Sequence, residues 1–128
     1  MGRRPSTRPT DAELEILQIL WEKGPCTVRE VLESLTEIRP TGYTTALKLL
    51  QIMADKGIVT RDEERKSHVY APAQPKEDTQ TKLLHDLAKR AFAGSVPSMA
   101  LHLIRSTTAT ETERAEMRVL VDKMSGEP

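Results

Sequence analysis

The sequence predicts a mainly α-helical fold with one small β-hairpin, and three observations lead to this prediction. Two Thr-x-x-Glu sequences near the N-terminus have the form of helix capping boxes, and each opens an apolar stripe of helical period. A third stripe ends at a glycine and is followed by two short β-favouring runs. The 128 residues, 38% of them hydrophobic, suffice for one ordinary domain or for a small domain with an appendage.

Residues 1–9 precede these signals and are expected to form a flexible basic arm. Arg3, Arg4 and Arg8 lie there among prolines and small polar residues, a composition that cannot bury enough apolar surface to fold by itself. The arm is either a disordered tail or a segment that touches phosphates or a minor groove of DNA.

The first two helices are expected to follow Thr10 and Thr27. Glu13 and Glu30, each three residues after a threonine, can complete a capping box. The first helix ends at Gly24, and the second is short. The apolar residues on one side of these helices are Leu14, Leu17, Leu20 and Trp21 in the first, and Val28, Val31, Leu32 and Leu35 in the second.

A third helix is expected from Thr41, its candidate N-cap, to about Lys56, with Gly57 at its C-terminal end. Its buried stripe is predicted to consist of Ala46, Leu49, Leu50 and Met53. Two β-favouring runs, 58–64 and 68–72, follow and indicate a hairpin. Three helices followed by a hairpin is the order of a winged helix-turn-helix DNA-binding domain, here predicted over residues 10–73.

The outward face of the third helix is the candidate DNA-reading surface. It carries small or flexible hydrogen-bonding side chains and one cation: Thr44, Thr45, Lys48 and Gln51. Carboxylates, which phosphate would repel, are absent from this helix until Asp55. The alternative is an ordinary solvated helix face. The predicted phosphate or minor-groove contacts of the wing are Arg61, Arg65 and Lys66.

The C-terminal half is expected to hold three more amphipathic helices, over about 77–92, 95–105 and 111–124, after a Pro-rich hinge at 72–78. About fifty residues with one aromatic side chain make a poor independent core, so a second copy would bury them better. Residues 77–124 are therefore predicted to be a homodimerisation module. The alternative is a small bundle folded back onto its own N-terminal domain.

The sequence contains no phosphate-binding loop and no catalytic or metal-ligand motif. Cys26 is the chain's one cysteine, and the three histidines are scattered, so no metal and no cofactor are expected. Four aromatic residues are too few for a surface that stacks the bases of single-stranded DNA or RNA.

The charges of the nineteen basic and nineteen acidic residues cancel, so the net charge neither supports nor excludes DNA binding. Only local clusters of charge can therefore give electrostatic evidence for DNA binding. Without an apolar run near the roughly 18 residues of a membrane span, no membrane insertion and a cytoplasmic location are expected.

Three segments together resemble the penicillinase-repressor family: "DAELEILQILWEKGPCTVREV", "GYTTALKLLQIMADKGIVTRDEERKSHVYAP" and "LAKRAFAGSVPSMALHLI". The resemblance implies a dimeric transcriptional repressor that binds a palindromic double-stranded DNA operator and is released by a signal. It also implies that Thr44, Thr45 and Lys48 face bases. Lys48 departs from the family's usual threonine, and Gln51 stands where arginine is common, so the operator sequence does not transfer.

Members of the family that respond to different release signals differ in their C-terminal sequence features. Copper-responsive relatives read the metal through paired C-terminal cysteines, and this chain has none. In β-lactam-responsive relatives, a membrane sensor protease cleaves a helix resembling "SMALHLI" next to an asparagine and a phenylalanine. Those positions resemble His102 and Leu103, so the candidate cleavage region is Leu101, His102 and Leu103.

The sequence therefore predicts a homodimeric DNA-binding repressor, not an enzyme. Its rival from another class is a protein-interaction adaptor that uses the winged helix for a protein partner and the C-terminal half for assembly. The salt dependence of the binding affinity distinguishes the two functions. Phosphate contacts make the affinity for DNA fall steeply as the salt concentration rises, whereas the affinity of an apolar protein interface barely changes.

Overall fold

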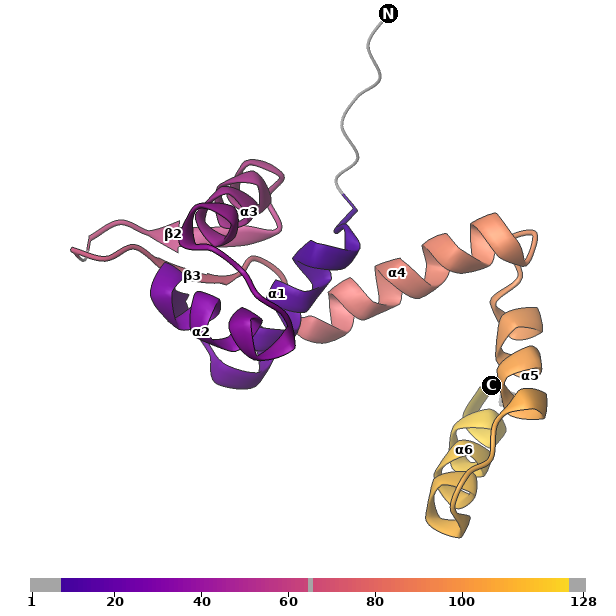
Figure 1. Cartoon of the computed structure of the whole chain (residues 1–128). Helices are drawn as coiled ribbons and strands as arrows, with labels where there is room; N and C mark the ends of the chain where they lie inside the picture. The colour runs from indigo at the N-terminus through magenta and orange to yellow at the C-terminus, as the bar shows by residue number, and fades with distance from the viewer. Residues whose placement is uncertain (1–7, 65, 125–128) are drawn as a thin grey trace, which may run out of the picture. The chain divides into compact units, whose positions relative to one another are not determined.

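The computed structural model describes residues 8–64 and 66–124, and it consists mainly of helices with a few short strands in the N-terminal half (Figure 1). The chain divides into two compact units, the second of which begins at Leu84, inside α4. In chain order the elements are α1 (Asp11–Lys23), β1 (Cys26–Thr27), α2 (Val28–Ile38), α3 (Tyr43–Asp55), β2 (Val59–Asp62), β3 (Val69–Pro72), α4 (Lys76–Ala91), α5 (Val96–Ser106) and α6 (Glu111–Met124).

Both predicted N-terminal capping boxes are confirmed. At α1, the Glu13 backbone N–H donates to Thr10 Oγ1 (3.2 Å), and the Thr10 N–H donates to the Glu13 carboxylate (2.9 Å). Thr27 and Glu30 repeat these two bonds at α2, at 3.2 and 2.8 Å. These local side chains satisfy backbone donors that the first helical turn leaves without a partner.

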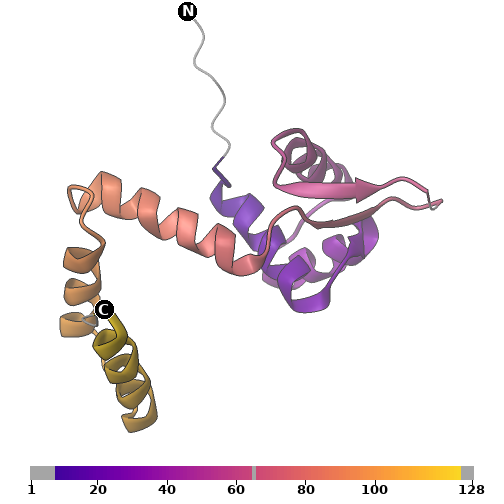
Figure 2. The same cartoon turned by 180° about the vertical axis from the view of Figure 1, so that it is seen from behind.

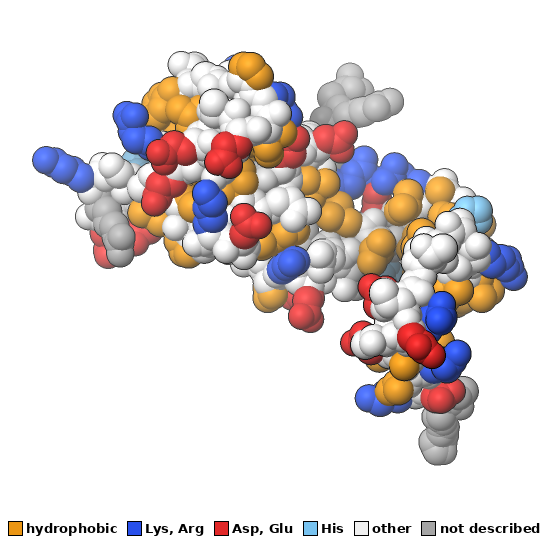
Figure 3. All heavy atoms as spheres, turned by 60° about the horizontal axis from the view of Figure 1, so that its bottom comes forward, with side chains coloured by type: hydrophobic (Ala, Val, Ile, Leu, Met, Phe, Trp, Pro, Cys, Tyr) orange, Lys and Arg blue, Asp and Glu red, His pale blue; other side chains and the backbone are white. Residues whose placement is uncertain are grey.

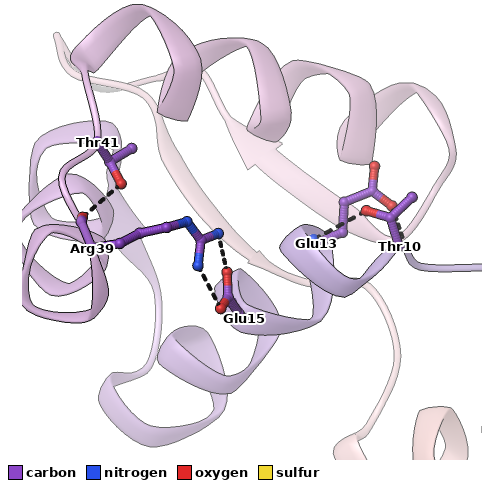
Figure 4. A network of polar contacts seen from close by, with 5 residues as sticks. All are labelled: Thr10, Glu13, Glu15, Arg39 and Thr41. Atoms are coloured by element: carbon purple, nitrogen blue, oxygen red, sulfur yellow. Dashed lines mark hydrogen bonds and ion pairs between the residues drawn. The ribbon is translucent and has the colours of Figure 1, made fainter.

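The predicted N-cap of the third helix is wrong. Gly42 occupies the N-cap position of α3, and no side chain caps it. The Thr41 hydroxyl donates instead to the Arg39 carbonyl oxygen (3.0 Å), within the α2–α3 connection (Figure 4). The Thr41 hydroxyl thus provides a hydrogen-bond partner for the carbonyl oxygen at the end of α2. Thr41 lies one residue before the N-cap position of α3 and does not cap that helix.

The sheet has a third strand that the sequence analysis missed. β3 is the central strand of the antiparallel order β1–β3–β2, with Cys26 opposite Tyr70 and Val59 opposite Pro72. Figures 1 and 2 show β2 and β3 running side by side and their connecting turn projecting beyond the helices. We call this hairpin with its turn, residues 59–72, the wing.

The core of the first unit is aliphatic, as the composition requires, and all three helices and the wing contribute to it. Tyr70 of β3 is the one aromatic residue among its fully buried members. The buried residues are Ile16, Leu17, Ile19 and Leu20 of α1, Cys26, Val28, Val31 and Leu35 around α2, Ala46, Leu50 and Met53 of α3, and Val59 and Tyr70 of the wing.

Two ion pairs tie α1 to other parts of this unit, and they differ in burial. Lys56, directly after α3, donates from Nζ to Glu13 Oε1 at 2.8 Å, and the two side chains are only 16% and 2% exposed. Arg39 makes a bidentate contact with Glu15 at the surface (Figure 4). The hydrogen bonds and charge of Arg39 lower the pKa of Glu15. The end of α3 is therefore fixed to the start of α1 by a charge pair removed from water.

Cys26 is a buried thiol of β1. Its Sγ lies 3.2 Å from the Gly24 carbonyl oxygen. Desolvation, helped by the charge of Glu30 and opposed by that of Lys23, raises the pKa of Cys26. The thiolate is therefore scarce as well as shielded from solvent.

We expect Cys26 to react with iodoacetamide at least about tenfold more slowly in the folded protein than in urea-unfolded chain at the same pH, because alkylation requires an accessible thiolate. Mass spectrometry over time measures this without ambiguity, since the chain contains one cysteine. Equal rates in both states would contradict a buried, protonated thiol.

The second unit contains α5, α6 and the end of α4, close to the predicted ranges. A third capping box, Thr110 with Glu113, opens α6 through bonds of 2.8 and 3.1 Å. The predicted hinge at 72–78 is partly helical, because α4 already begins at Lys76. Among its described residues, this unit buries only Ala88 and Met99, while most of its leucine, isoleucine and valine side chains are exposed.

Candidate nucleic-acid interface

The α3 face, which we define as Thr44, Thr45, Lys48 and Gln51, is exposed along its whole length. It has this orientation because Ala46, Leu50 and Met53 on the other side of the helix are completely buried. Leu49 of the predicted stripe is partly buried against the same core. One cation and three uncharged polar side chains are thus presented to solvent on a rigid helix.

At the N-terminal end of α3, a surface pocket of about 360 Å³ opens toward the wing. Tyr43 and Leu47 of α3 line one side, Arg29 of α2 lines another, and Lys66 and His68 come from the wing turn. We call it the wing pocket. None of the described residues that line it carries a carboxylate, so its charged groups are cationic.

At the C-terminal end of α3, the neighbouring surface has the opposite character. A second hollow is lined by Gln51 and Asp55 of α3 together with Thr60, Arg61 and Glu63 of the wing. Arg61 donates from Nε to Glu63 Oε2 at 2.8 Å, and its Nη2 lies 2.6 Å from the same oxygen. A hydrogen bond to the Tyr70 side chain and the pairing with Glu63 raise the pKa of Arg61. The cation of Arg61 is therefore already partly neutralised.

The structure separates the predicted wing residues. Lys66 is exposed in the turn and lines the wing pocket, whereas Arg61 lies in β2 at the other end of α3. Arg65 lies outside the described residues. The described residues of the predicted site thus form one continuous surface on α3, with Lys66 near its beginning and Arg61 near its end.

Sequence reasoning missed Arg29, Tyr43 and His68. Tyr43 is the first residue of α3 and is 48% exposed, and Arg29 and His68 are also exposed. An exposed aromatic side chain at the start of a candidate reading helix was the available signal. The convergence of the three side chains on one pocket depends on tertiary packing and could not be read from their spacing.

The candidate cleavage residues Leu101, His102 and Leu103 lie in α5, and all three are exposed. The His102 ring packs beside Phe92, with ring centroids 5.9 Å apart. No group of histidine, cysteine or acidic side chains in the described ranges could hold a metal ion. No helix in the described part of the chain is both long and apolar enough to cross a lipid bilayer.

Comparisons with known proteins identify relatives over nearly the whole chain. The family model for the penicillinase repressor matches residues 9–123. The chain is 32% identical over 122 residues to the transcriptional regulator BlaI of Mycobacterium tuberculosis (strain H37Rv), which covers 94% of this chain and 88% of that protein. It is 23% identical over 114 residues to the penicillinase repressor of Bacillus licheniformis, covering 89% of each.

A more distant relative and a solved structure point to the same family and fold. The methicillin resistance regulatory protein MecI of Staphylococcus aureus (strain N315) is 20% identical over 114 residues, covering 89% of this chain and 93% of that protein. The solution structure of the DNA-binding domain of the repressor BlaI matches 59% of this chain and 93% of that chain, with a TM-score of 0.51 at 24% identity. This likeness confirms the predicted fold class of a winged helix domain in a mainly helical chain. The chain belongs to the penicillinase repressor family of DNA-binding transcriptional repressors, and it is not an enzyme.

Proposed function

We propose that two copies of this chain bind one palindromic DNA operator, with the α3 face of each copy in a major groove, and that a signal which separates the copies ends repression. The observation that carries the proposal is the α3 face itself. It is exposed, free of carboxylates and backed by a fully buried stripe, so the core fixes its direction.

The α3 face suits base reading because of its side-chain chemistry. Threonine and glutamine offer hydrogen-bond donors and acceptors for base edges, and the Thr44 and Thr45 methyl groups suit thymine. Lys48 can donate to guanine O6 or N7. Lys66 of the wing would meet the adjacent phosphate backbone, which fixes the register of the protein on the duplex but carries no sequence information.

The second unit supports dimerisation because it leaves many apolar side chains exposed, and a large exposed apolar surface marks a protein interaction site (Figure 3). The α6 stripe, which we define as Met117, Leu120, Val121 and Met124, is 39–78% exposed. Leu103 and Ile104 of α5 border an apolar hollow of about 480 Å³ that also reaches Met117. A second copy presenting the same surface would cover these side chains by twofold symmetry, and residues 77–124 would then set the distance between the two half-sites.

Release by proteolysis is the finer part of this proposal. Cleavage around Leu101, His102 and Leu103 would separate α6 and part of α5 from the DNA-binding unit. Because linking two half-site binders raises the effective concentration of the second, loss of the link would weaken operator binding without touching the α3 face. A membrane sensor protease, as the family resemblance implies, would be the partner that acts there.

The rival function is a protein-interaction adaptor that uses the α3 face for a protein partner. Binding of duplex DNA with about six to ten phosphate contacts should weaken on the order of a thousandfold or more between about 50 and 200 mM salt. A protein partner held through apolar contacts would show little such dependence. Selecting binding sites from a randomised duplex library and titrating the best one at several salt concentrations tests the proposal.

We expect Lys48→Ala to weaken binding to the selected operator by about 1 to 3 kcal/mol and to relax preference at one base pair of each half-site, because a base contact is lost. Fluorescence anisotropy with a panel of single-base variants measures both effects. Lys89→Ala, which removes an exposed lysine from α4, is the matched control. If both variants bind every duplex alike, Lys48 does not read a base.

A further inference from the structure

We infer that the wing pocket is a binding site for one backbone phosphate of the operator, held by Arg29, Tyr43 and His68 together with Lys66. This inference rests on the proposed function, because it presumes that α3 lies in a major groove. It assigns a role to three residues that the α3 face does not include. It also places a contact on α2, outside both the reading helix and the β-strands of the wing.

The chemistry of the pocket suits a phosphate. Arg29 supplies a guanidinium, which can bind two phosphate oxygens at once, and Lys66 supplies an ammonium group. The Tyr43 hydroxyl donates one hydrogen bond, and the His68 imidazole carries an N–H donor in either protonation state. The volume of about 360 Å³ exceeds what one phosphate group fills, so the pocket can admit the backbone on both sides of it.

The acidic residue closest in sequence does not line the pocket. Glu30 follows Arg29 in the first turn of α2, but its carboxylate accepts a hydrogen bond from the Thr27 backbone N–H (2.8 Å) in the capping box. The same turn is the N-terminal end of an 11-residue helix, where the helix dipole favours negative charge. The cationic side chains and the dipole therefore act in the same direction.

The position of the pocket fits the backbone that borders a major groove. A helix with its side chains is about 10–12 Å across and the groove is about 12 Å wide, so residues at the edge of an inserted helix meet the flanking phosphates. Tyr43 and Leu47 line the pocket and directly precede Thr44 and Lys48 of the α3 face. A phosphate in the pocket is thus next to the bases that α3 would read.

The other end of α3 cannot offer an equivalent site. Its hollow contains the carboxylates of Asp55 and Glu63, and Glu63 holds the Arg61 side chain at 2.6–2.8 Å. A phosphate there would have to displace a carboxylate from its cation. The asymmetry indicates that the N-terminal end of α3 and the wing pocket lie closest to the DNA backbone.

The test measures the affinity of the full-length protein for the selected operator, and for a random-sequence duplex of about 30 base pairs, between about 50 and 200 mM salt. For Arg29→Ala we expect about tenfold weaker binding to both duplexes at about 100 mM salt, and a salt slope lower by about one, because one phosphate contact is lost. Arg29→Lys should keep the slope and lose only part of the affinity. Tyr43→Phe should weaken both duplexes about threefold with no change in slope.

Arg90→Ala is the matched control, because it removes an exposed arginine of α4 whose charge is paired with Asp86 at 2.8 Å, and it should change affinity less than twofold. Thermal unfolding checks that each variant is folded. Because Arg29 is exposed, we expect its replacement to leave the fold intact. If Arg29→Ala keeps the wild-type slope and affinity while Lys48→Ala still weakens operator binding, the wing pocket holds no phosphate although the proposed function stands. If Arg61→Ala lowers the slope and Arg29→Ala does not, the backbone lies at the other end of α3. Wild-type protein that selects no DNA sequence would instead contradict the proposed function itself.

Discussion

Lys56→Ala should lower the free energy of unfolding by about 3 kcal/mol, the largest stability effect that we expect from a single charged residue in this chain. The reason is that Glu13 is 2% exposed and its carboxylate stays buried when its partner at 2.8 Å is removed. The remaining hydrogen bond from the Thr10 backbone does not supply a positive charge. Urea-induced unfolding followed by circular dichroism measures the change.

Arg39→Ala is the control for this experiment. It breaks a bidentate pair with Glu15 whose side chains are 49% and 31% exposed, so water replaces the lost partner and the cost should stay below about 1 kcal/mol. The double variant Glu13→Gln, Lys56→Met removes both charges and should recover most of the stability that Lys56→Ala loses. If Lys56→Ala and Arg39→Ala lowered the free energy of unfolding by equal amounts, burial would not determine how much the Glu13–Lys56 pair contributes to stability.

The sequence predicted those parts of the fold whose signals are local. A capping box requires only a threonine and a glutamate three residues apart, and both that were predicted near the N-terminus, at Thr10 and Thr27, are present. A third box of the same form opens α6 at Thr110. The inward direction of Ala46, Leu50 and Met53 follows from helical period alone, and the exposure of the α3 face follows from it.

The remaining features depend on contacts between distant residues. β1 is two residues long and exists because Cys26 and Thr27 pair with β3, more than forty positions later. Thr41 has the chemistry of an N-cap, but the α2–α3 connection directs its hydroxyl to Arg39. Arg61 was predicted to contact phosphates or the minor groove, and only the folded hairpin reveals its pairing with Glu63.

The wing pocket illustrates the same limit for the candidate site. Arg29, Tyr43 and His68 belong to three different elements, and no spacing in the sequence relates them. The α3 face is one helix surface and could therefore be predicted from the sequence, whereas a pocket that three elements build together could not.

Leu120→Glu should convert the protein to a monomer and weaken binding to the full operator about a hundredfold or more, because the second half-site then loses the effective concentration that a linked copy provides. Leu120 is 62% exposed in the single chain and lies in the middle of the α6 stripe, so in a dimer the new carboxylate would enter an apolar interface. Light scattering gives the oligomeric state, and titration with the full operator and with a single half-site gives the affinities.

Val119→Glu is the matched control, since it places the same charge one residue earlier on the same helix. A helix turns by about 100° per residue, so Val119, which is 53% exposed, lies on the side of α6 away from the stripe. Val119→Glu should remain dimeric with wild-type operator affinity, and both variants should bind a single half-site as the wild type does, because the α3 face is intact in each. Should Leu120→Glu stay dimeric, or bind the full operator as tightly as Val119→Glu at matched salt, the α6 stripe is not the dimer interface, and cleavage in α5 would then have no dimer contact of α6 to remove.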